Sequence, residues 1–339
     1  MDLQSTLNRH LSFWTRSANA TPLVGRPQQD SVFPLRNLRC SLPEGRLGPE
    51  DIQPDEFLPV KDGESPVEGD GDLPHAHWAI PALPWTEAIA GCPVFVLQQS
   101  GTTWARPVLA DAEPLTTYRP AVDRAWLAKL TACTKALVDH AAGDYFVSTT
   151  LMRGPLDMLG AMLGTARLFL AFTDEPEQVP RLLRVCTDVW IEAAEAQFSV
   201  IPSTAGGYVN RYRLWAPGRS VVTQADISSL ISPHTYARFL SPCDARLGET
   251  FDYLTIHTHS AGQTQLDHWL AQPSRDCIEI SVDHLGPTFA EQIPLYRRIL
   301  EQKSLVLMNL NEDEVSLALR ELPASGLAIL PRWQSNLQA

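Results

Sequence analysis

The stretch NRYRLWAPGRSVVTQADISSLISP (residues 210–233), followed by a helical segment and by FDYLTIHTHS (residues 251–260), decides the fold. Its apolar runs near residues 223 and 254 predict two strands. Between them, Ser232-Pro233 predicts a helix start, because serine caps a helix and proline fits the first turn. A strand, a helix and a strand in this order predict a parallel pair with a right-handed crossover. Polar side chains gather where both strands end, which is typical of the edge of a sheet that carries an active site.

The same alternation continues on both sides of this span. From Asp144 onward strands alternate with helices, and eight strand candidates occur near residues 22, 77, 147, 209 or 223, 254, 279, 306 and 328. This pattern predicts an α/β fold, a single (β/α)8 TIM-type barrel over residues 1–339. Residues 1–75 would form an N-terminal helical and irregular extension with the first strand and an acidic loop, and residues 76–331 the rest of the barrel. The chain has neither a G-x-G-x-x-G nor a P-loop motif, so nucleotide-binding folds are not indicated.

One helix start is harder to place. Asp174 with Glu177 three residues later resembles a capping box, which predicts that a long helix begins there. Pro180 falls inside that helix, where proline breaks the hydrogen-bond pattern. The helix therefore either bends or begins later than the capping pattern suggests.

Composition and charge exclude several classes of partner. A net charge of −12 argues against nucleic acid and anionic membranes, because few groups would neutralise phosphates. The six cysteines have no paired spacing, which predicts reduced and mostly buried thiols. The N-terminus lacks the apolar core of a signal peptide, and no run of eighteen apolar residues occurs. We predict a cytoplasmic protein with no membrane partner, and a homodimer as an open alternative to a monomer.

His257 and His259 stand at the end of the strand candidate DYLTIH. In a β/α barrel the active-site residues come from the C-terminal ends of the strands. Side chains two residues apart in a strand point the same way, so one metal ion or one substrate could meet both histidines. Zinc needs a further ligand, and four residues qualify by position: Asp226, Cys277, Glu279 and His284. The alternative is a pair of hydrogen-bonded histidines without a metal.

Gln224 and Asp226 form a second pair two residues apart, just before the predicted helix start at Ser232. A carboxylate at the mouth of a barrel suits a general acid or a group that stabilises positive charge, since burial raises its pKa. We therefore predict Asp226 and His257 as catalytic residues, with Gln224 and His259 beside the substrate. The alternative for Asp226 is a local cap or a partner for an arginine.

Three arginines, Arg211, Arg213 and Arg219, flank Trp215. The planar guanidinium group binds both oxygens of a carboxylate, so one of these arginines is expected to hold an acidic substrate. Four residues could form the pocket wall, with ordinary packing as the alternative: Trp85, Glu87, Trp104 and Trp215. The alternative is that the arginines pair with the many carboxylates of the chain.

Several segments together resemble one known superfamily. They are RGPLDMLGAMLG (residues 153–164), TQADISSLISPHTYARFLSP (residues 223–242), the His-x-His at 257–259 and the strand ISVD that ends at Asp283. In order and spacing these segments resemble the uroporphyrinogen decarboxylase superfamily, which also contains zinc-dependent methylcobamide methyltransferases. The resemblance covers roughly residues 140–331 and implies a β/α barrel.

The departures from that superfamily bear on function. The methyltransferase relatives bind zinc through His-x-Cys and a distant cysteine after the last strand. Here the motif is His257-Thr258-His259, and the late position falls at Arg332–Trp333 without a cysteine. Any metal site would therefore be histidine-based. The arginine-rich N-terminal signature of uroporphyrinogen decarboxylases has no equivalent, so uroporphyrinogen itself is not the expected substrate.

Three functions follow from this combination. The first is a lyase that decarboxylates a carboxylate-bearing small molecule by acid–base chemistry without a cofactor, using Asp226 and His257. The second is a metal-dependent methyltransferase in which His257 and His259 bind zinc and a corrinoid or another molecule donates the methyl group. The third is a barrel that binds a ligand without catalysis.

Overall fold

The computed structural model describes residues 3–26, 42–60, 71–109, 113–273, 277–283 and 286–332. Its largest sheet has six strands in the order β1-β13-β12-β11-β10-β9, and every neighbouring pair is parallel. These strands are β1 (Leu23–Val24), β9 (Ser220–Gln224), β10 (Tyr253–His259), β11 (Cys277–Ser281), β12 (Ser304–Leu310) and β13 (Leu327–Pro331). The predicted α/β fold with a parallel sheet is confirmed.

Two more parallel strands extend this arrangement. β3 (Ala76–His77) pairs with β6 (Phe146–Val147), and a parallel bridge between Arg153 and Gln224 joins the segment after β6 to β9. The eight positions predicted from the sequence therefore all hold a strand; near residue 209 lies the short β7 (Tyr208–Val209) and near 223 lies β9. At the other edge, Gly71 bridges Gly25 in antiparallel fashion. Among the described residues no ladder joins β3 to β1.

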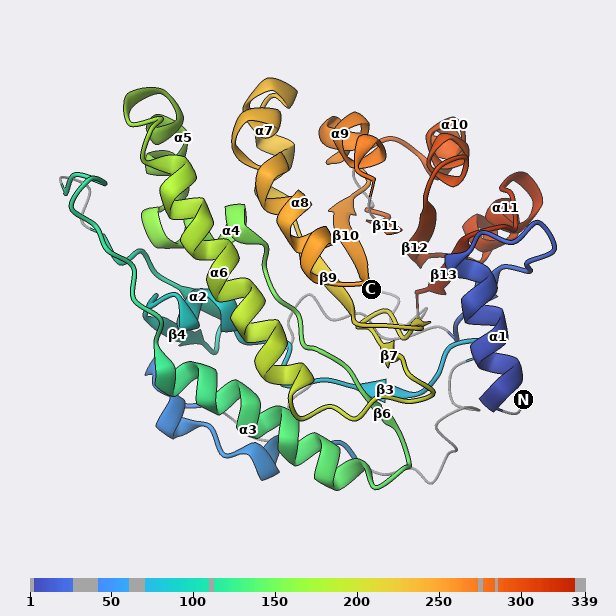
Figure 1. Ribbon diagram of the computed structural model, residues 1–339, viewed down its shortest axis with the longest axis horizontal. Helices are drawn as coiled ribbons and strands as arrows, with labels where there is room; N and C mark the ends of the chain where they lie inside the picture. The colour runs from blue at the N-terminus through green and yellow to red at the C-terminus, as the bar shows by residue number, and fades with distance from the viewer. Residues whose placement is uncertain are drawn as a thin grey trace.

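The longer helices follow the strands in chain order, and Figure 1 shows α6 to α11 lying outside the parallel strands. The bounds are α1 (Leu3–Trp14), α2 (Trp85–Ile89), α3 (Arg124–Ala141), α4 (Pro155–Leu163), α5 (Thr165–Asp174), α6 (Val179–Phe198), α7 (Pro233–Phe239), α8 (Ser241–Thr250), α9 (Leu266–Ala271), α10 (Phe289–Leu300) and α11 (Glu312–Glu321). The outward side chains of the strands, such as Leu254, Ile278 and Leu305, are buried in the core cluster that also contains side chains of these helices.

The helix starts test the capping predictions. Ser232 caps α7, because its hydroxyl accepts a hydrogen bond from the Thr235 nitrogen at 3.1 Å. The start predicted at Asp174 is wrong: Asp174 ends α5, and α6 begins at Val179. Pro180 explains the shift, since proline has no amide hydrogen and is tolerated only in the first turn of a helix.

Two smaller sheets accompany the parallel strands. β2 (Gly45–Leu47), β4 (Val94–Leu97) and β5 (Thr102–Ala105) form an antiparallel sheet, and β7 pairs with β8 (Trp215–Ala216) in a hairpin. The predicted acidic loop is described only up to residue 60 and from residue 71, and it contains two short 3-10 helices, η2 (Pro49–Asp51) and η3 (Pro54–Phe57).

The thiols and helices also bear on the compositional predictions. All five cysteines in the described ranges are buried and none forms a disulfide with another of them, as predicted, and Cys40 lies outside those ranges. In the part of the chain that the structure describes, no single helix is long and apolar enough to cross a membrane. α4 and α5 would be so only as a pair, and they are bent by 102°.

The inner face of the parallel sheet changes from apolar to polar along the strands. Tyr212, from the turn between β7 and β8, lies in an apolar cluster whose members include Phe13, Leu23, Val222, Cys277, Val306 and Ala328. Further toward the carboxyl ends, Gln224, His257 and Glu279 are direct neighbours in the register of β9, β10 and β11. The polar side chains therefore lie toward the carboxyl ends of the strands, and the apolar cluster lies behind them along the strands.

Candidate functional site

Two histidines and one carboxylate converge at the carboxyl ends of β9 and β10. Asp226 begins the 3-10 helix η4 (Asp226–Leu230) directly after β9, and His257 and His259 close β10. Nε2 of His257 lies 3.6 Å and Nε2 of His259 lies 3.9 Å from Oδ1 of Asp226. One ligand atom from each of the three residues lies within 4.8 Å of the others. The structure therefore brings together the predicted His-x-His and the predicted carboxylate.

Hydrogen bonds decide which nitrogen of each histidine faces Asp226. Nδ1 of His257 is bonded to Glu279, and Nδ1 of His259 is bonded to Asp283 at 3.0 Å. A carboxylate accepts, so each Nδ1 carries a proton and each Nε2 faces Asp226; when the ring is neutral, its lone pair is on Nε2. Metal-binding histidines are held in this way by a carboxylate on the second nitrogen. Both histidines of this site have that arrangement.

The two carboxylate oxygens of Asp226 differ in their hydrogen bonds. Gln224 donates from Nε2 to Oδ2 of Asp226 at 2.5 Å. Oδ1 is buried and accepts no hydrogen bond from the described residues. A buried acceptor without a donor costs free energy, roughly 1–3 kcal/mol. A cation between Oδ1 and the two Nε2 atoms would satisfy it, so the donor set fits a metal ion.

Glu279 supports His257 from a fully buried position on β11. It accepts hydrogen bonds from the Tyr212 hydroxyl at 2.7 Å and from the Ser281 hydroxyl at 3.0 Å. Burial, followed by the Glu279 charge, raises the pKa of Tyr212 well above its usual value, so Tyr212 stays a donor. Of the four candidates for a further zinc ligand, Glu279 is thus a support for His257 rather than a ligand.

The other candidates have different positions. Cys277 lies in the apolar cluster and pairs with Thr255, two residues before His257 in β10. It is not part of the group formed by Asp226, His257 and His259. His284 lies outside the described residues, as does Trp333, whereas Arg332 is described. Asp226 is therefore the candidate that completes the group.

The charge state of His257 follows from its surroundings. Burial is the largest influence on its pKa and lowers it, but the Glu279 carboxylate, its hydrogen bond and the Asp226 charge together raise the pKa above the usual value. In the absence of another cation, the carboxylates favour a proton on His257. A metal ion would replace that proton, because histidine ligands bind in the neutral form.

A buried acid on α4 holds the backbone of Asp226. The carboxylate of Asp157 accepts hydrogen bonds from the nitrogens of Asp226 at 3.2 Å and Ile227 at 2.9 Å. Burial, followed by the charge of Asp226, raises the pKa of Asp157 to about 7. The sequence contains this residue in RGPLDMLG, but an acid in the first turn of a helix is common, because it complements the helix dipole. Its link to Asp226 had no signal in the sequence.

The structure does not bring Arg219 or Trp215 to this group. Arg219 precedes β9 and lies at the amino end of that strand, where it pairs with Glu195 at 2.5 Å and donates to the Thr250 carbonyl at 2.8 Å. Trp215 packs in a small cluster with Leu7, and its indole nitrogen donates to the Thr204 carbonyl at 2.9 Å. Both side chains have a structural role in place of the predicted contact with substrate.

Arg211 and Arg213 flank Tyr212 in the turn between β7 and β8. The charge of Arg211 acts against the rise in the pKa of His257 and of Tyr212. Arg213 is almost fully buried, with 1% of its surface exposed, and has a positive φ of 59°. Of the three arginines in the predicted stretch, Arg211 is the one whose charge reaches the histidines.

A cavity of about 520 Å³ adjoins the group, and Asp226 forms part of its wall. The wall also contains Trp104, Arg153, Asp157, Gly164 and Ile227. Nη1 of Arg153 is paired with the buried Glu87 at 2.9 Å. The charge of Glu87 is the largest cause that raises the pKa of Arg153. Trp104 was among the residues that could line a pocket, whereas Arg153 was not among the residues predicted from the sequence.

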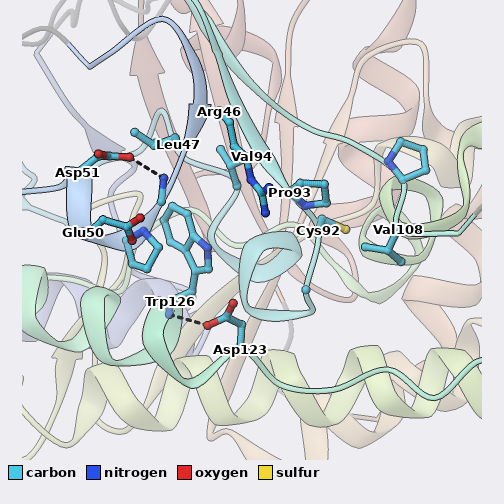
Figure 2. A pocket seen from close by; sticks show the side chains of 14 residues that line it. Arg46, Leu47, Glu50, Asp51, Cys92, Pro93, Val94, Val108, Asp123 and Trp126 are labelled. Atoms are coloured by element: carbon cyan, nitrogen blue, oxygen red, sulfur yellow. Dashed lines mark hydrogen bonds between the residues drawn. The ribbon is translucent and has the colours of Figure 1, made fainter.

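A larger cavity, of about 660 Å³, lies between β2, β4 and the start of α3 and is shown in Figure 2. Two of its carboxylates have structural partners: Asp51 accepts from the Gly48 nitrogen at 2.7 Å, and Asp123 caps α3. Burial raises the pKa of the Cys92 thiol, which keeps it protonated and unreactive. None of the residues predicted for the site lines this cavity, so we place the site at the smaller one.

The fold has a known counterpart. No protein-family model matches the chain, and no curated protein matches it in sequence. Among solved structures, the chain is similar to a methyltransferase from Methanosarcina mazei, with a TM-score of 0.63 and 13% identity over 96% of this chain and 92% of that one. The fold resembles that of a methyltransferase. At this identity the likeness shows the shared fold and agrees with the resemblance found in the sequence.

Proposed function

We propose that the protein is a metal-dependent methyltransferase in which Asp226, His257 and His259 hold a zinc ion. The observation that carries the proposal is the convergence of two Nε2 lone pairs and one buried carboxylate oxygen, with both Nδ1 atoms bound to carboxylates. The similarity in fold to a methyltransferase supports it. Of the three functions expected from the sequence, this is the second.

The spacing of the donor atoms agrees with zinc. In a tetrahedral site with bonds of about 2.0–2.1 Å, neighbouring ligand atoms are roughly 3.3 Å apart. The two measured separations from Asp226 Oδ1, 3.6 and 3.9 Å, exceed that value by a few tenths of an ångström. Three protein ligands also leave the fourth position for a substrate, as catalytic zinc sites require.

The side chains around the donors have defined tasks in this proposal. When bound, zinc supplies a Lewis acid that lowers the pKa of a thiol or water in the open position. Glu279 and Asp283 keep the protons of His257 and His259 on Nδ1. Gln224 and Asp157 orient the carboxylate and the backbone of Asp226. The methyl donor is a corrinoid or another methyl-bearing molecule.

Decarboxylation, the first function expected from the sequence, has less support. It requires an arginine that is free to hold the substrate carboxylate beside Asp226. Arg219 lies at the other end of β9 and Arg153 is paired with Glu87, so Arg211 is the arginine that remains for this role. Decarboxylation also requires Asp226 as a free acid, whereas its Oδ1 faces two histidine nitrogens. We therefore favour methyl transfer.

We also propose that the eight parallel strands close into a (β/α)8 barrel of the uroporphyrinogen decarboxylase superfamily. The continuous register from β1 to β9, the bridge at Arg153 and the bridge between Gly25 and Gly71 support closure. The match over 96% of the chain to the methyltransferase structure agrees with it.

Zinc titration of chelator-treated protein by calorimetry tests the metal site. We expect the wild type to bind one equivalent of zinc and the His257→Ala, His259→Ala double variant to lose that binding. His234→Ala, which removes an exposed histidine from α7, is the matched control and should bind as the wild type does. Equal zinc binding by the wild type and the double variant would rule out the proposed ligands.

A further inference from the structure

The cavity beside Asp226 has an aromatic wall that the metal site does not explain. Trp104 lies on β5, and 61% of its surface is exposed although it lines the cavity. A large aromatic side chain is normally packed, because its apolar surface is costly to leave in water. Its exposed surface is therefore available to a ligand that enters the cavity beside Asp226.

The charges of the wall favour a positive ligand. Asp157 and Asp226 both line the cavity, and Asp157 is nearly fully buried, with 6% of its surface exposed. Among the described residues that line the cavity, Arg153 is the one cation, and its charge is offset by the fully buried Glu87 at 2.9 Å. The wall is then left with the carboxyl groups of Asp157 and Asp226 and with no cation that lacks a carboxylate partner, which disfavours an anion.

An aromatic ring and carboxylates together are the groups that recognise methylated cations. The face of an indole ring attracts ammonium and sulfonium groups, and such contacts contribute about 0.5–2 kcal/mol. A cavity of about 520 Å³ has room for a trimethylated head group and more. The small residues Ala161 and Gly164 are also part of its wall.

We infer that this cavity binds an onium ion, a methylated ammonium or sulfonium compound, with Trp104 against its methyl groups and Asp157 as the counter-charge that remains when Asp226 holds the metal. This inference rests on the proposed methyl transfer and assigns the methyl donor to that class. In the transfer, the lone pair of an acceptor thiolate forms the new carbon–sulfur bond. The carbon–nitrogen or carbon–sulfur bond of the donor breaks, and its electron pair stays on the neutral amine or thioether.

Calorimetric titration with choline and with its uncharged isostere 3,3-dimethyl-1-butanol tests the inference. Both probes have the same shape, so the difference between them reports the charge. We expect choline to bind about tenfold more tightly or better, and trimethylsulfonium, titrated separately, to show whether sulfonium ions bind as well as ammonium ions. The titrations use the protein as purified and again after removal of metal by a chelator.

Substitutions at an exposed position keep the test independent of folding. Trp104→Leu should weaken choline binding by roughly 2- to 30-fold, and Trp104→Phe should retain part of it, because phenylalanine has a weaker aromatic face. Leu319→Ala, which removes a similarly exposed apolar side chain from α11, should leave binding unchanged.

Three results would overturn the inference: no choline binding, equal binding of the uncharged isostere, or unchanged binding in Trp104→Leu. These outcomes are separable from failure of the metal site. If the wild type binds choline but does not bind zinc, only the metal proposal is rejected. Zinc binding without choline binding would reject the onium site alone.

Discussion

The carboxylate of Asp157 accepts a hydrogen bond from the backbone nitrogen of Asp226 at 3.2 Å, so an acid on α4 holds the residue that faces two histidines on β10. A second bond, from Ile227 at 2.9 Å, fixes the same turn. The position of Asp226 thus depends on a helix that contributes no ligand itself.

Replacement of Asp157 should therefore weaken metal binding. Asp157→Asn keeps one acceptor oxygen but places an NH2 group against a backbone N–H, so the turn at Asp226 should shift. We expect zinc affinity to fall by about tenfold, as for other groups that orient a metal ligand. Competition with a fluorescent chelator measures it. Asp139→Asn, an exposed acid paired with Lys135, is the control, and an Asp157→Asn protein with wild-type affinity would refute the orienting role.

Glu279 should act on the metal through His257. Glu279→Gln removes the charge that raises the pKa of His257, so that pKa should fall in metal-free protein. Zinc affinity should fall by about 10- to 100-fold, because the histidine becomes a weaker donor. NMR titration of the His257 ring follows the pKa, with the exposed Glu249→Gln as control. An unchanged His257 pKa would contradict the contact between these side chains.

Metal affinity should depend on pH through His257. Its pKa is raised, so the proton competes with zinc below that pKa, and affinity should fall about tenfold for each further pH unit. Above that pKa this histidine contributes no further dependence. Calorimetry in buffers of different ionisation enthalpy counts the protons released, and we expect release to grow as the pH is lowered through the pKa. Zinc binding with no proton release at low pH would show that His257 is not a ligand.

Stability should depend on pH through His10 in α1. Nδ1 accepts from the Trp215 nitrogen at 3.0 Å and Nε2 contacts the Asp72 carbonyl at 3.0 Å, so the buried ring is held neutral. Burial is the main cause that lowers its pKa from 6.5 to about 4. The unfolded chain therefore takes up the proton first. The contribution is complete above pH 6.5 and is lost as the pH falls toward 4, up to roughly 3 kcal/mol.

Urea denaturation at several pH values measures this effect. His10→Asn should flatten the dependence between pH 4 and 6.5 relative to the wild type, whereas His234→Asn on the exposed face of α7 should not. The same slope in His10→Asn and wild type would show that another group is responsible.

Much of the fold could be predicted because apolar runs mark buried strands. The strand positions and the cap at Ser232 follow from local pattern and are present in the structure. The start predicted at Asp174 was wrong, since a capping pair also occurs by chance and Pro180 decides where α6 begins. Closure between β3 and β1 depends on contacts between distant segments, which a local pattern does not contain.

The sequence predicted those parts of the site in which the spacing of residues along a strand determines where their side chains point. His257 and His259 share a face because strand residues alternate, and both face Asp226, one of the four candidates for a further ligand. Arg219 lies in the same short stretch, but it precedes β9 and therefore falls at the opposite end of the strand. Asp157 and Arg153 come from other segments, so their nearness to Asp226 could not be predicted from the sequence. Trp104 was predicted only as one of four residues that could line a pocket.

X-ray absorption at the zinc edge of the zinc-loaded protein tests the central claim most directly. Two histidines and one aspartate predict a first shell of nitrogen and oxygen at about 2.0–2.1 Å, with imidazole scattering that is lost in the His257→Ala, His259→Ala variant. A first shell that contains sulfur from the protein at about 2.3 Å, or one that is unchanged in the double variant, would contradict the account.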